Sequence, residues 1–315
     1  MRLVVALGGN ALLRRHEPLT HDRQRANVRR AAAALAPLAR DHALVVTHGN
    51  GPQIGLLALQ QESAAGRFPL DVLGAQTEGM IGYLLEQALD ELLPKERLVA
   101  SLLTRVLVDA RDPAFASPSK FVGPSYASEE AARALEAKYG WRFRRDGADW
   151  RRVVPSPRPL EILEQRVIAL LLERGVTLVC GGGGGIPVLR DDAGHEVGVE
   201  AVVDKDHASA LLAGAIGADG LLLLTDVPAV ALDFGQSSAR AIRHASPAML
   251  ADFAFPAGSM GPKVEAACAF VSGTGGFAAI GALEDAGAIL AGERGTRIDR
   301  NATALVLESA VASES

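Results

Sequence analysis

Cysteine is scarce in this chain, which holds only two cysteines among its 315 residues. Cys180 and Cys268 lie far apart in sequence, in segments that are apolar enough to be buried. Disulfide frameworks and zinc sites need more cysteines at closer spacing. We therefore expect two small core residues, with neither a disulfide framework nor a metal site.

Long apolar runs are also missing, because no stretch reaches the ~18 residues that a membrane-spanning helix requires. The chain enters a predicted strand within three residues and lacks the charged, apolar and cleavage regions of a signal peptide. We expect a cytoplasmic protein without a membrane partner.

Three motifs of nucleotide and metal enzymes are absent as well. No G-x-x-x-x-G-K-[ST] occurs, which excludes a P-loop enzyme. The nearest dinucleotide pattern, Gly273, Gly275 and Ala278, follows a predicted helix and precedes a strand, the reverse of a Rossmann turn. His195-Glu196 lacks the second histidine of a zinc protease, since Val199 stands at that spacing. A metal at the site is expected to be Mg²⁺ that arrives with phosphate.

Positive charge is in deficit, with a net charge of −5 and an isoelectric point near 5.8. Nucleic acids and anionic membranes would favour a basic field, so neither is expected as the main partner. The basic and aromatic run 141–152 suggests single-stranded nucleic acid, but Asp146 and Asp149 temper it and favour an exposed hairpin. Anions must be bound locally.

Glycine is plentiful, and three apolar runs end in glycine turns. They are LVVALGGN at 3–10, ALVVTHGNG at 43–51 and VTLVCGGGGG at 176–185. Glycine lets backbone N–H groups turn toward one point and lets an anion approach without a Cβ in the way. One such turn alone would be a tight connection, whereas three together favour a site for more than one phosphate.

The hydrophobic period alternates between strand and helix along most of the chain. Strands are expected at 2–7, 43–47, 97–103, 176–180, 221–226 and 277–281, and helices at about 21–40, 53–62, 74–92, 159–174, 206–216, 261–272 and 283–290. Right-handed crossovers then predict a parallel sheet with helices on both faces and ligands at the carboxyl ends of its strands. The proline-rich, turn-rich stretch at about 112–157 is predicted to be an inserted subdomain.

Lysine makes up only five of the 32 basic residues. Lys95 and Lys138 lie on charged stretches and are expected to be solvated. Lys120, Lys205 and Lys263 stand in unusual places, and a compact ammonium suits a migrating phosphoryl group. Asp206 beside Lys205 either caps the helix that follows or orients the ammonium groups, and the sequence leaves these alternatives open.

Nine ordered stretches over nearly the whole chain belong together. They are VVALGGNAL, THGNGPQIG, GAQTEGMIGY, DPAF followed by SKFVGP, RRVVPSPRP, CGGGGIPV, GVEAVVDKDHAS, LLTDV and GSMGPKV. A GGN or GGGG alone is weak, but GVEAVVDKDHAS together with GSMGPKV is specific. In these stretches the chain resembles the carbamate kinases of the amino acid kinase fold family.

The resemblance implies an α/β fold, a three-layer αβα sandwich with a mainly parallel central sheet and a small protruding subdomain at about 112–157. Residues 1–315 would form a single domain, with a carbamoyl phosphate-binding lobe at 1–200 and a nucleotide-binding lobe at 201–315. The enzyme would transfer a phosphoryl group reversibly between carbamoyl phosphate and ADP, giving ATP and carbamate. Mg²⁺ would accompany the nucleotide, and a homodimer is implied.

The resemblance also implies roles for individual residues. The catalytic set would be Lys120, Lys205, Asp206 and Lys263. The small substrate would lie against Gly8, Gly9, Asn10, Gly49, Asn50 and Gly51. The nucleotide would contact Gly182, Gly183, Gly184, Lys205, Thr225, Asp226, Val227, Met260, Gly261 and Lys263.

Asn10 stands where relatives of this fold that phosphorylate amino acids or UMP generally carry a lysine. Its amide offers hydrogen bonds but no charge, so positive charge must reach the transferring phosphoryl group from elsewhere. Lys120 in the insertion is the candidate, on a lobe that the resemblance places over the acyl phosphate. Phe121 replaces a proline that commonly follows this lysine, and Ala231 replaces a residue that is often aromatic.

Two other functions stay open. The same fold could phosphorylate another small acid or a phosphonate. Alternatively, the chain could be a nucleotide-binding storage or sensor protein without transfer chemistry, although the intact Lys120, Lys205, Asp206 and Lys263 argue against it.

Overall fold

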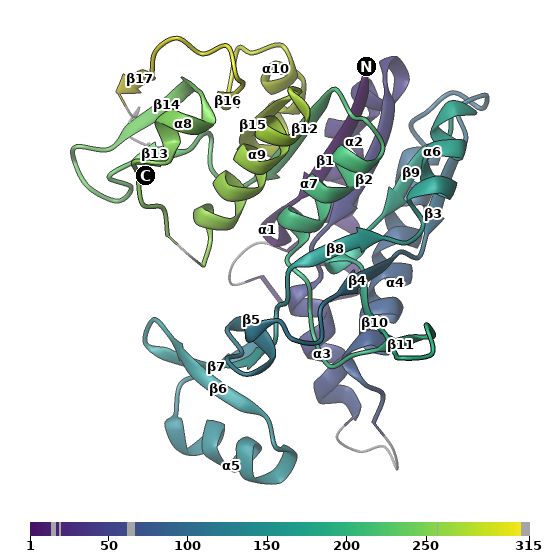
Figure 1. Ribbon diagram of the computed structural model, residues 1–315, viewed down its shortest axis with the longest axis vertical. Coiled ribbons are helices and arrows are strands. Elements are labelled where there is room, and N and C mark those ends of the chain that lie inside the picture. The colour runs from purple at the N-terminus through teal and green to yellow at the C-terminus, as the bar shows by residue number, and fades with distance from the viewer. Residues whose placement is uncertain (14–16, 19, 62–66, 257, 310–315) are drawn as a thin grey trace.

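The computed structural model describes residues 1–13, 17–18, 20–61, 67–256 and 258–309, without the side chains of Asn10, Ala11 and Ser309. A large twisted sheet forms its centre (Figure 1). Its strands are β1 (Arg2–Leu7), β2 (Ala43–His48), β3 (Val99–Leu102), β9 (Thr177–Cys180), β12 (Gly220–Thr225), β13 (Ala231–Leu232), β14 (Arg240–Ala245), β15 (Phe277–Ala282), β16 (Thr296–Ile298) and β17 (Val306–Ser309). The order is β13-β14-β16-β15-β12-β1-β2-β9-β3, with β17 on β14.

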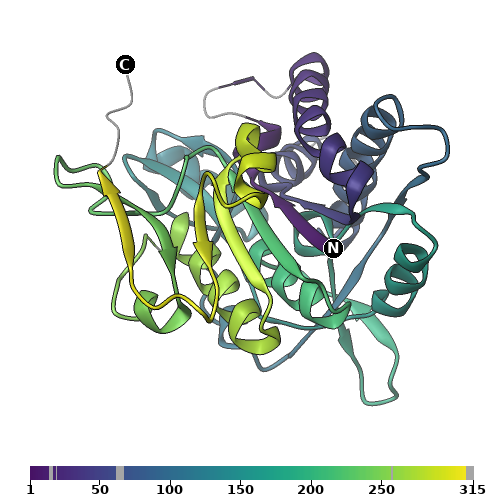
Figure 2. The same cartoon turned by 90° about the horizontal axis from the view of Figure 1, so that it is seen from above.

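The middle of this sheet is parallel, from β15 through β12, β1, β2 and β9 to β3. Helices cover both faces (Figure 2). One face carries α2 (His21–Asp41), α4 (Leu70–Asp90) and α10 (Ala286–Leu290), and the other carries α6 (Gln165–Glu173), α7 (Lys205–Ala215) and α9 (Met260–Thr274). The expected three-layer αβα architecture is confirmed.

Strand β1 shows how the sequence builds these layers. Leu3, Val5 and Leu7 join the core under α2, α4 and α10. Val4 and Ala6 join the core under α6, α7 and α9. All five side chains are fully buried. A strand covered on both faces has no polar side, and it therefore appears in the sequence as an unbroken apolar run.

The expected helix at 159–174 is wrong in its first part. Pro159–Ile162 forms strand β8, and α6 begins only at Gln165. Prolines at 155, 157 and 159 keep the chain extended and deny a helix its early N–H groups. β8 belongs to a second sheet, with the order β11-β10-β4-β8, that the periodicity missed. Its other strands are β4 (Arg105–Val108), β10 (Ile186–Arg190) and β11 (Glu196–Gly198).

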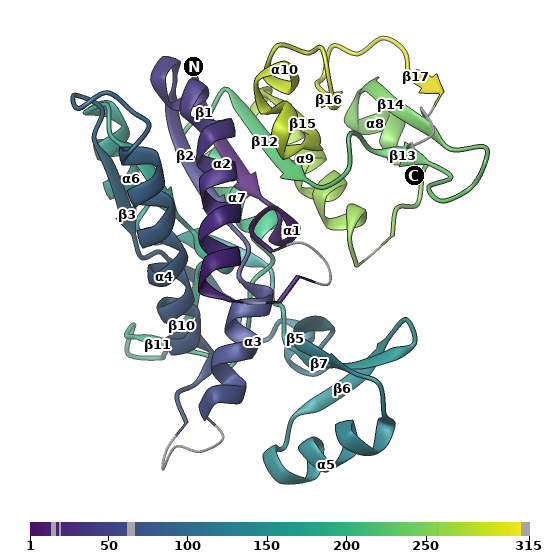
Figure 3. The same ribbon diagram turned by 180° about the vertical axis from the view of Figure 1, so that it is seen from behind.

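The insertion forms a separate small layer below the body (Figures 1 and 3). It consists of β5 (Lys120–Tyr126), α5 (Glu129–Tyr139), β6 (Arg142–Asp146) and β7 (Asp149–Val154), with the strand order β5-β7-β6. Helix α3 (Gly51–Gln60) packs against β5. A Cβ on Gly55 of α3 would lie 1.9 Å from the Cα of Gly123, whose φ is +74°. Two glycines thus let the insertion touch the body backbone to backbone.

Short elements complete the described chain: α1 (Gly9–Leu12), α8 (Pro247–Leu250), and the 3₁₀ turns Pro113–Phe115, Gly182–Gly184 and Leu283–Asp285. Both cysteines are free thiols, but only Cys180 is fully buried, whereas Cys268 is half-buried. Burial raises the pKa of Cys268 to about 11. Among the described residues, no helix combines the length and the apolar character needed to cross a membrane.

Candidate active site

The first two glycine turns lie side by side at the carboxyl ends of the neighbouring strands β1 and β2. The amide of Gly8 donates to the carbonyl of Leu224 on β12 at 2.8 Å. The amide of Gly49 donates to the carbonyl of Leu7 at 3.1 Å. A Cβ on Gly49 would lie 3.2 Å from the nitrogen of Gly9. Glycine therefore lets two loops bring main-chain groups to one point of the sheet edge.

Helix α3 begins at the second turn. Its N-cap residue Asn50 makes no side-chain capping bond, and its Nδ2 donates instead to Thr77 Oγ1 on α4 at 2.8 Å. Thr77 donates in turn to the carbonyl of Gly74 at 2.9 Å. The N–H groups in the first turn of α3 are thus not capped by Asn50, and the helix dipole favours an anion there.

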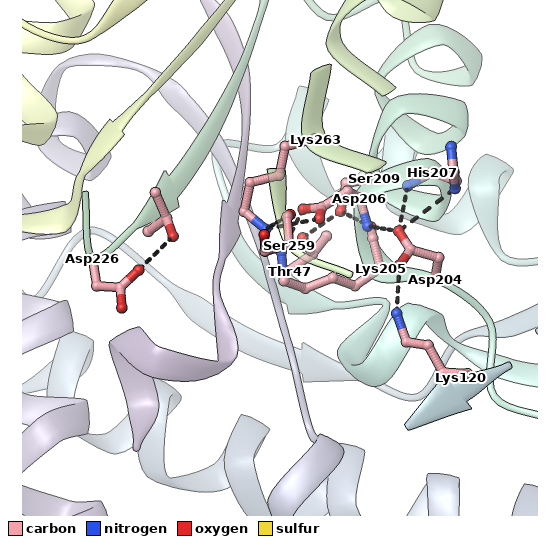
Figure 4. Close-up of polar contacts among 11 residues, drawn as sticks. Thr47, Lys120, Asp204, Lys205, Asp206, His207, Ser209, Asp226, Ser259 and Lys263 are labelled. Atoms are coloured by element: carbon pink, nitrogen blue, oxygen red, sulfur yellow. Dashed lines mark hydrogen bonds and ion pairs between the residues drawn. The ribbon is translucent and has the colours of Figure 1, made fainter. Parts of the chain in front are cut away.

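A buried carboxylate joins two lysines at the amino termini of α7 and α9 (Figure 4). Asp206 Oδ1 accepts from Lys205 Nζ at 2.5 Å, and Oδ2 accepts from Lys263 Nζ at 3.2 Å. The side chains are 5% exposed for Asp206, 10% for Lys205 and 13% for Lys263. Because α7 and α9 pack together, their first turns present both ammonium groups to one carboxylate.

Burial and the neighbouring charges have opposite effects on the pKa values in this cluster. Burial alone would raise the pKa of Asp206, but the two ammonium groups outweigh it and lower the pKa overall. Burial lowers the pKa of Lys205, Lys263 lowers it further, and Asp206 works against both. Asp206 therefore remains a carboxylate that keeps two like charges close together.

The cap of α7 is Asp204, and this settles the alternatives for Asp206. Asp204 Oδ1 accepts from the amides of Asp206 at 2.9 Å and His207 at 3.3 Å. Its Oδ2 accepts from Lys120 Nζ at 2.5 Å (Figure 4). Lys120 lies at the start of β5, so the insertion reaches the body through this ion pair. Asp206 orients the two lysines, and the alternative in which it caps the helix is wrong.

A hydroxyl relay fixes the first turn of α7 to the sheet. Ser209 Oγ donates to the carbonyl of Lys205 at 2.6 Å. Thr47 Oγ1 lies 2.6 Å from Ser209 Oγ, and it donates because the hydroxyl hydrogen of Ser209 is already used. All three residues are buried. The backbone that carries Lys205 is therefore held at the end of β2.

The third glycine turn is a buried packing element beside the second one. Four of its residues have positive φ, at 181, 183, 184 and 185. A Cβ on Gly183 would lie 2.1 Å from Asn50 Nδ2, and a Cβ on Gly184 would lie 2.4 Å from the carbonyl oxygen of Val203. The consecutive glycines are required by left-handed backbone and by contact with the protein itself. The turn follows β9, on the β2 side of the sheet rather than beside β12.

Two buried ionisable groups support this turn. The sequence analysis predicted no role for either of them. Glu78 on α4 accepts from the amides of Gly182 at 2.9 Å and Thr104 at 3.2 Å. Burial raises its pKa to about 8, against the opposing effect of these hydrogen bonds. Burial also lowers the pKa of His48 to about 4, so its ring is neutral at pH 7. A Cβ on Gly182 would lie 2.4 Å from this ring.

The remaining expected residues lie at the ends of β12 and at the start of α9. Thr225 ends β12, and its Oγ1 donates to Asp226 Oδ1 at 3.1 Å. Asp226 is exposed and Val227 is half-buried. Met260 is the first residue of α9. The amide of Gly261 donates to the carbonyl of Pro256 at 2.9 Å.

Comparisons with known proteins identify the family of the chain. The model of the amino acid kinase family matches residues 1–277. Carbamate kinase of Rhizobium meliloti is 55% identical over 95% of this chain and 93% of the relative. That of Haemophilus influenzae is 50% identical over 95% of this chain and 97% of the relative. The chain belongs to the carbamate kinases of the amino acid kinase family.

Solved structures of this carbamate kinase group share the fold. The enzyme from Giardia lamblia bound to AMP-PNP superposes with a TM-score of 0.85 at 39% identity, covering 95% of this chain and 98% of that one. Within the present chain, the contacts described above connect all four charged residues expected from the family: Lys120, Lys205, Asp206 and Lys263. The side chain of Asn10 lies outside the described residues.

Sequence reasoning missed several residues that hold the site together. They are His48, Thr77, Glu78 and Asp204. A signal existed for two of them. Asp204 and Asp206 flank Lys205 symmetrically, so either acid could have been the cap. Glu78 stands in a stretch of α4 whose buried side is otherwise uncharged, where an unpaired carboxylate would be costly.

Proposed function

We propose that this protein catalyses reversible phosphoryl transfer between carbamoyl phosphate and ADP, giving ATP and carbamate. The observation that carries the proposal is the set of three lysines held by two aspartates at the carboxyl edge of the sheet. Phosphoryl transfer needs positioning and charge neutralisation more than covalent chemistry. Both are available in this arrangement.

Lys205 and Lys263 are proposed to neutralise the transferring phosphoryl group and the adjoining nucleotide phosphates. Asp206 holds the two ammonium groups close together before any substrate binds. The electrostatic cost of bringing these like charges together is therefore met when the protein folds. A preorganised pair of this kind stabilises negative charge on the equatorial oxygens without further rearrangement.

The small substrate is proposed to lie on the paired turns at Gly8, Gly9, Asn10, Gly49, Asn50 and Gly51. Support comes from the close approach of these turns and from the amino terminus of α3. Lys120 would add its charge from the insertion, which would act as a lid. In this division, residues 1–200 form the carbamoyl phosphate lobe and residues 201–315 the nucleotide lobe.

The nucleotide is proposed to lie near the end of β12 and the start of α9. The residues are Thr225, Asp226, Val227, Met260, Gly261 and Lys263, together with Lys205. For Gly182, Gly183 and Gly184 we propose a different role from the expected nucleotide contact. Gly182 packs on His48, Gly183 on Asn50 and Gly184 on Val203, so these glycines would shape the small-substrate side from behind.

Mg²⁺ is proposed to accompany ADP and ATP. When bound, it would neutralise the charge of the phosphates. Among the described residues, there is no group of three or more histidine, cysteine or acidic side chains placed to hold a metal. Mg²⁺ keeps several waters and takes ligands from phosphates, so it does not need a cage of protein side chains.

We also propose that the protein is cytoplasmic and that its partners are these small molecules and a second copy of the chain. Neither nucleic acid nor a membrane is proposed as a partner. An exposed apolar face supports the homodimer: Met80 and Tyr83 on α4, and Leu98 and Leu103 beside β3. β3 is an edge strand of the central sheet, and α4 packs against it. Tyr83→Asp should dissociate the dimer in light scattering.

The deciding experiment measures ATP formation from carbamoyl phosphate and ADP with purified protein. Wild type should turn over, and Lys263→Ala should lose on the order of 10²-fold in kcat. Lys95→Ala, which removes an exposed lysine outside the site, should behave as wild type. Turnover with another small acid or a phosphonate, but none with carbamoyl phosphate, would move the protein to a different kinase. Nucleotide binding without any transfer would make it a sensor.

A further inference from the structure

We propose that Asp204 is a positioning residue, with one carboxylate oxygen that fixes the first turn of α7 and another that holds the lid lysine Lys120 over the site. The inference rests on the proposed function for the identity of the substrate. The contacts of the two carboxylate oxygens lie within the protein and do not depend on which substrate binds.

The first oxygen acts on the body of the enzyme. Asp204 Oδ1 accepts from the amides of Asp206 and His207, which are among the N–H groups that a helix cannot satisfy internally. Lys205 and Asp206 are the first two residues of the helix capped in this way. Frayed backbone at this point would displace both side chains, so the cap fixes the central charge cluster.

The second oxygen acts on the insertion. Asp204 Oδ2 lies 2.5 Å from Lys120 Nζ, and the two side chains are 15% and 35% exposed. Lys120 belongs to β5, which pairs with β7 inside the insertion. This pair therefore connects the sheet of the insertion to the amino terminus of α7. Burial raises the pKa of Asp204, but Lys120, His207 and Lys205 together lower it overall, so Asp204 remains a carboxylate.

The arrangement gives Lys120 a fixed place before any substrate binds. A lysine on a protruding layer would otherwise sample many rotamers, and ordering it would weaken binding. Carbamoyl phosphate has few atoms, and the number of non-hydrogen atoms limits the binding free energy that a small ligand can gain. A pre-positioned ammonium reduces the ordering that such a substrate must bring about. A phosphate can then share or replace the carboxylate, since both accept charge-assisted hydrogen bonds.

The two roles can be separated because some substitutions keep an oxygen that caps α7 but lose the negative charge that pairs with Lys120. Asparagine and serine cap helices about as well as aspartate, so Asp204→Asn and Asp204→Ser should keep α7 in place. Neither carries the charge that holds Lys120, and serine is also too short to reach it. Asp204→Ala should lose both roles. Asp192→Asn, in the exposed turn between β10 and β11, is the matched control for the loss of one negative charge.

Hydrogen exchange of the ligand-free protein tests the contacts without reference to activity. Asp204→Asn and Asp204→Ser should speed exchange in β5 at least threefold and leave the first turn of α7 unchanged. Asp204→Ala should speed exchange in both. If β5 exchanges at the wild-type rate in Asp204→Asn while Asp204→Ala loosens α7, Asp204 is only a helix cap and the proposal is overturned.

Steady-state kinetics tests the consequence. Asp204→Asn should raise the KM for carbamoyl phosphate about tenfold, with the KM for ADP and kcat changed less than threefold. Asp204→Ala should lower kcat as well. An unchanged or lowered KM for carbamoyl phosphate in Asp204→Asn would contradict the positioning role. If wild type forms no ATP, the proposed function is wrong, and the exchange experiment still decides whether the contact holds the lid.

Discussion

The lysines of the body and the lysine of the lid are held in different ways. Lys205 and Lys263 come from two packed helices, share one carboxylate and are about one-tenth exposed. Lys120 comes from a small separate sheet, pairs with a different carboxylate and is 35% exposed. A partly exposed pair can exchange its partner for a substrate phosphate more readily than a buried pair, which is costly to break.

This difference indicates a division of labour. In the proposed mechanism, the buried pair would offer fixed charge to the transferring phosphoryl group in every step of the cycle. The more exposed pair would offer charge that moves with the lid when a small substrate enters or leaves. The supports differ in the same way. Glu78 holds the third glycine turn, which packs on the second, while the lid touches α3 through Gly55 and Gly123.

The largest effect is expected from breaking the fixed pair. Lys205→Ala should lower kcat on the order of 10²- to 10³-fold, because a preorganised donor to the transition state is lost. Lys120→Ala should act mainly on the KM for carbamoyl phosphate, with a smaller loss in kcat. Steady-state assays of both variants measure this contrast. Equal losses in kcat would remove the distinction between fixed and movable charge.

Next in size is the buried glycine turn. Gly184→Ala should destabilise the protein by about 3 kcal/mol, through strain at φ +93° and a Cβ only 2.4 Å from the carbonyl oxygen of Val203. Gly194→Ala is the matched control, with φ +84° and nothing within 4 Å. It should lose only about 1 kcal/mol. Urea unfolding measures the loss of stability in both variants. Similar losses would mean that strain of the left-handed backbone alone, without the contact to Val203, accounts for the glycine at 184.

Glu78 makes the body sensitive to pH. Its folded-state pKa is raised from 4.5 to about 8, so the folded protein binds more protons than the unfolded chain between these values. This contribution to stability is complete below pH 4.5 and is lost as the pH rises toward 8. Between pH 5.5 and 7.5, wild type should lose about 2 kcal/mol relative to Glu78→Gln. Urea unfolding at both pH values measures it, and parallel pH profiles would contradict the raised pKa.

A smaller effect is expected where the lid touches the body. Gly55→Ala would place a Cβ 1.9 Å from the Cα of Gly123 and push β5 away from α3. The KM for carbamoyl phosphate should rise about tenfold, equivalent to about 1.4 kcal/mol, with little change in the KM for ADP. Gly74→Ala on α4 has open space and should keep wild-type kinetics. A rise in both KM values would show that the contact supports more than the lid.

The smallest effect lies within the lid itself. Ser128 caps α5 by accepting from the amide of Ala131 at 3.0 Å. Ser128→Ala should cost the lid about 1 kcal/mol of local stability and change kcat less than twofold. Hydrogen exchange in α5 measures the loss, and Ser128→Asp should restore it. A large fall in kcat would mean that α5 takes part in the transfer step.

Much of the fold could be predicted because it is encoded locally. Buried parallel strands appear as continuous apolar runs, and β1, β2, β9 and β12 were found in this way. β4, β8, β10 and β11 were missed, because short and partly exposed strands carry no clear period. The prolines before β8 were the available signal that its residues do not form a helix.

The sequence by itself determined the alternating elements, the inserted layer, the family, and the lysines on which the site depends. Only the tertiary structure decided which carboxylate each lysine meets. Asp204 and Asp206 are two residues apart, but one lies before α7 and the other inside its first turn, so they point in different directions. Local sequence is symmetric about Lys205, and only the packing of α7 against α9 and the lid breaks that symmetry.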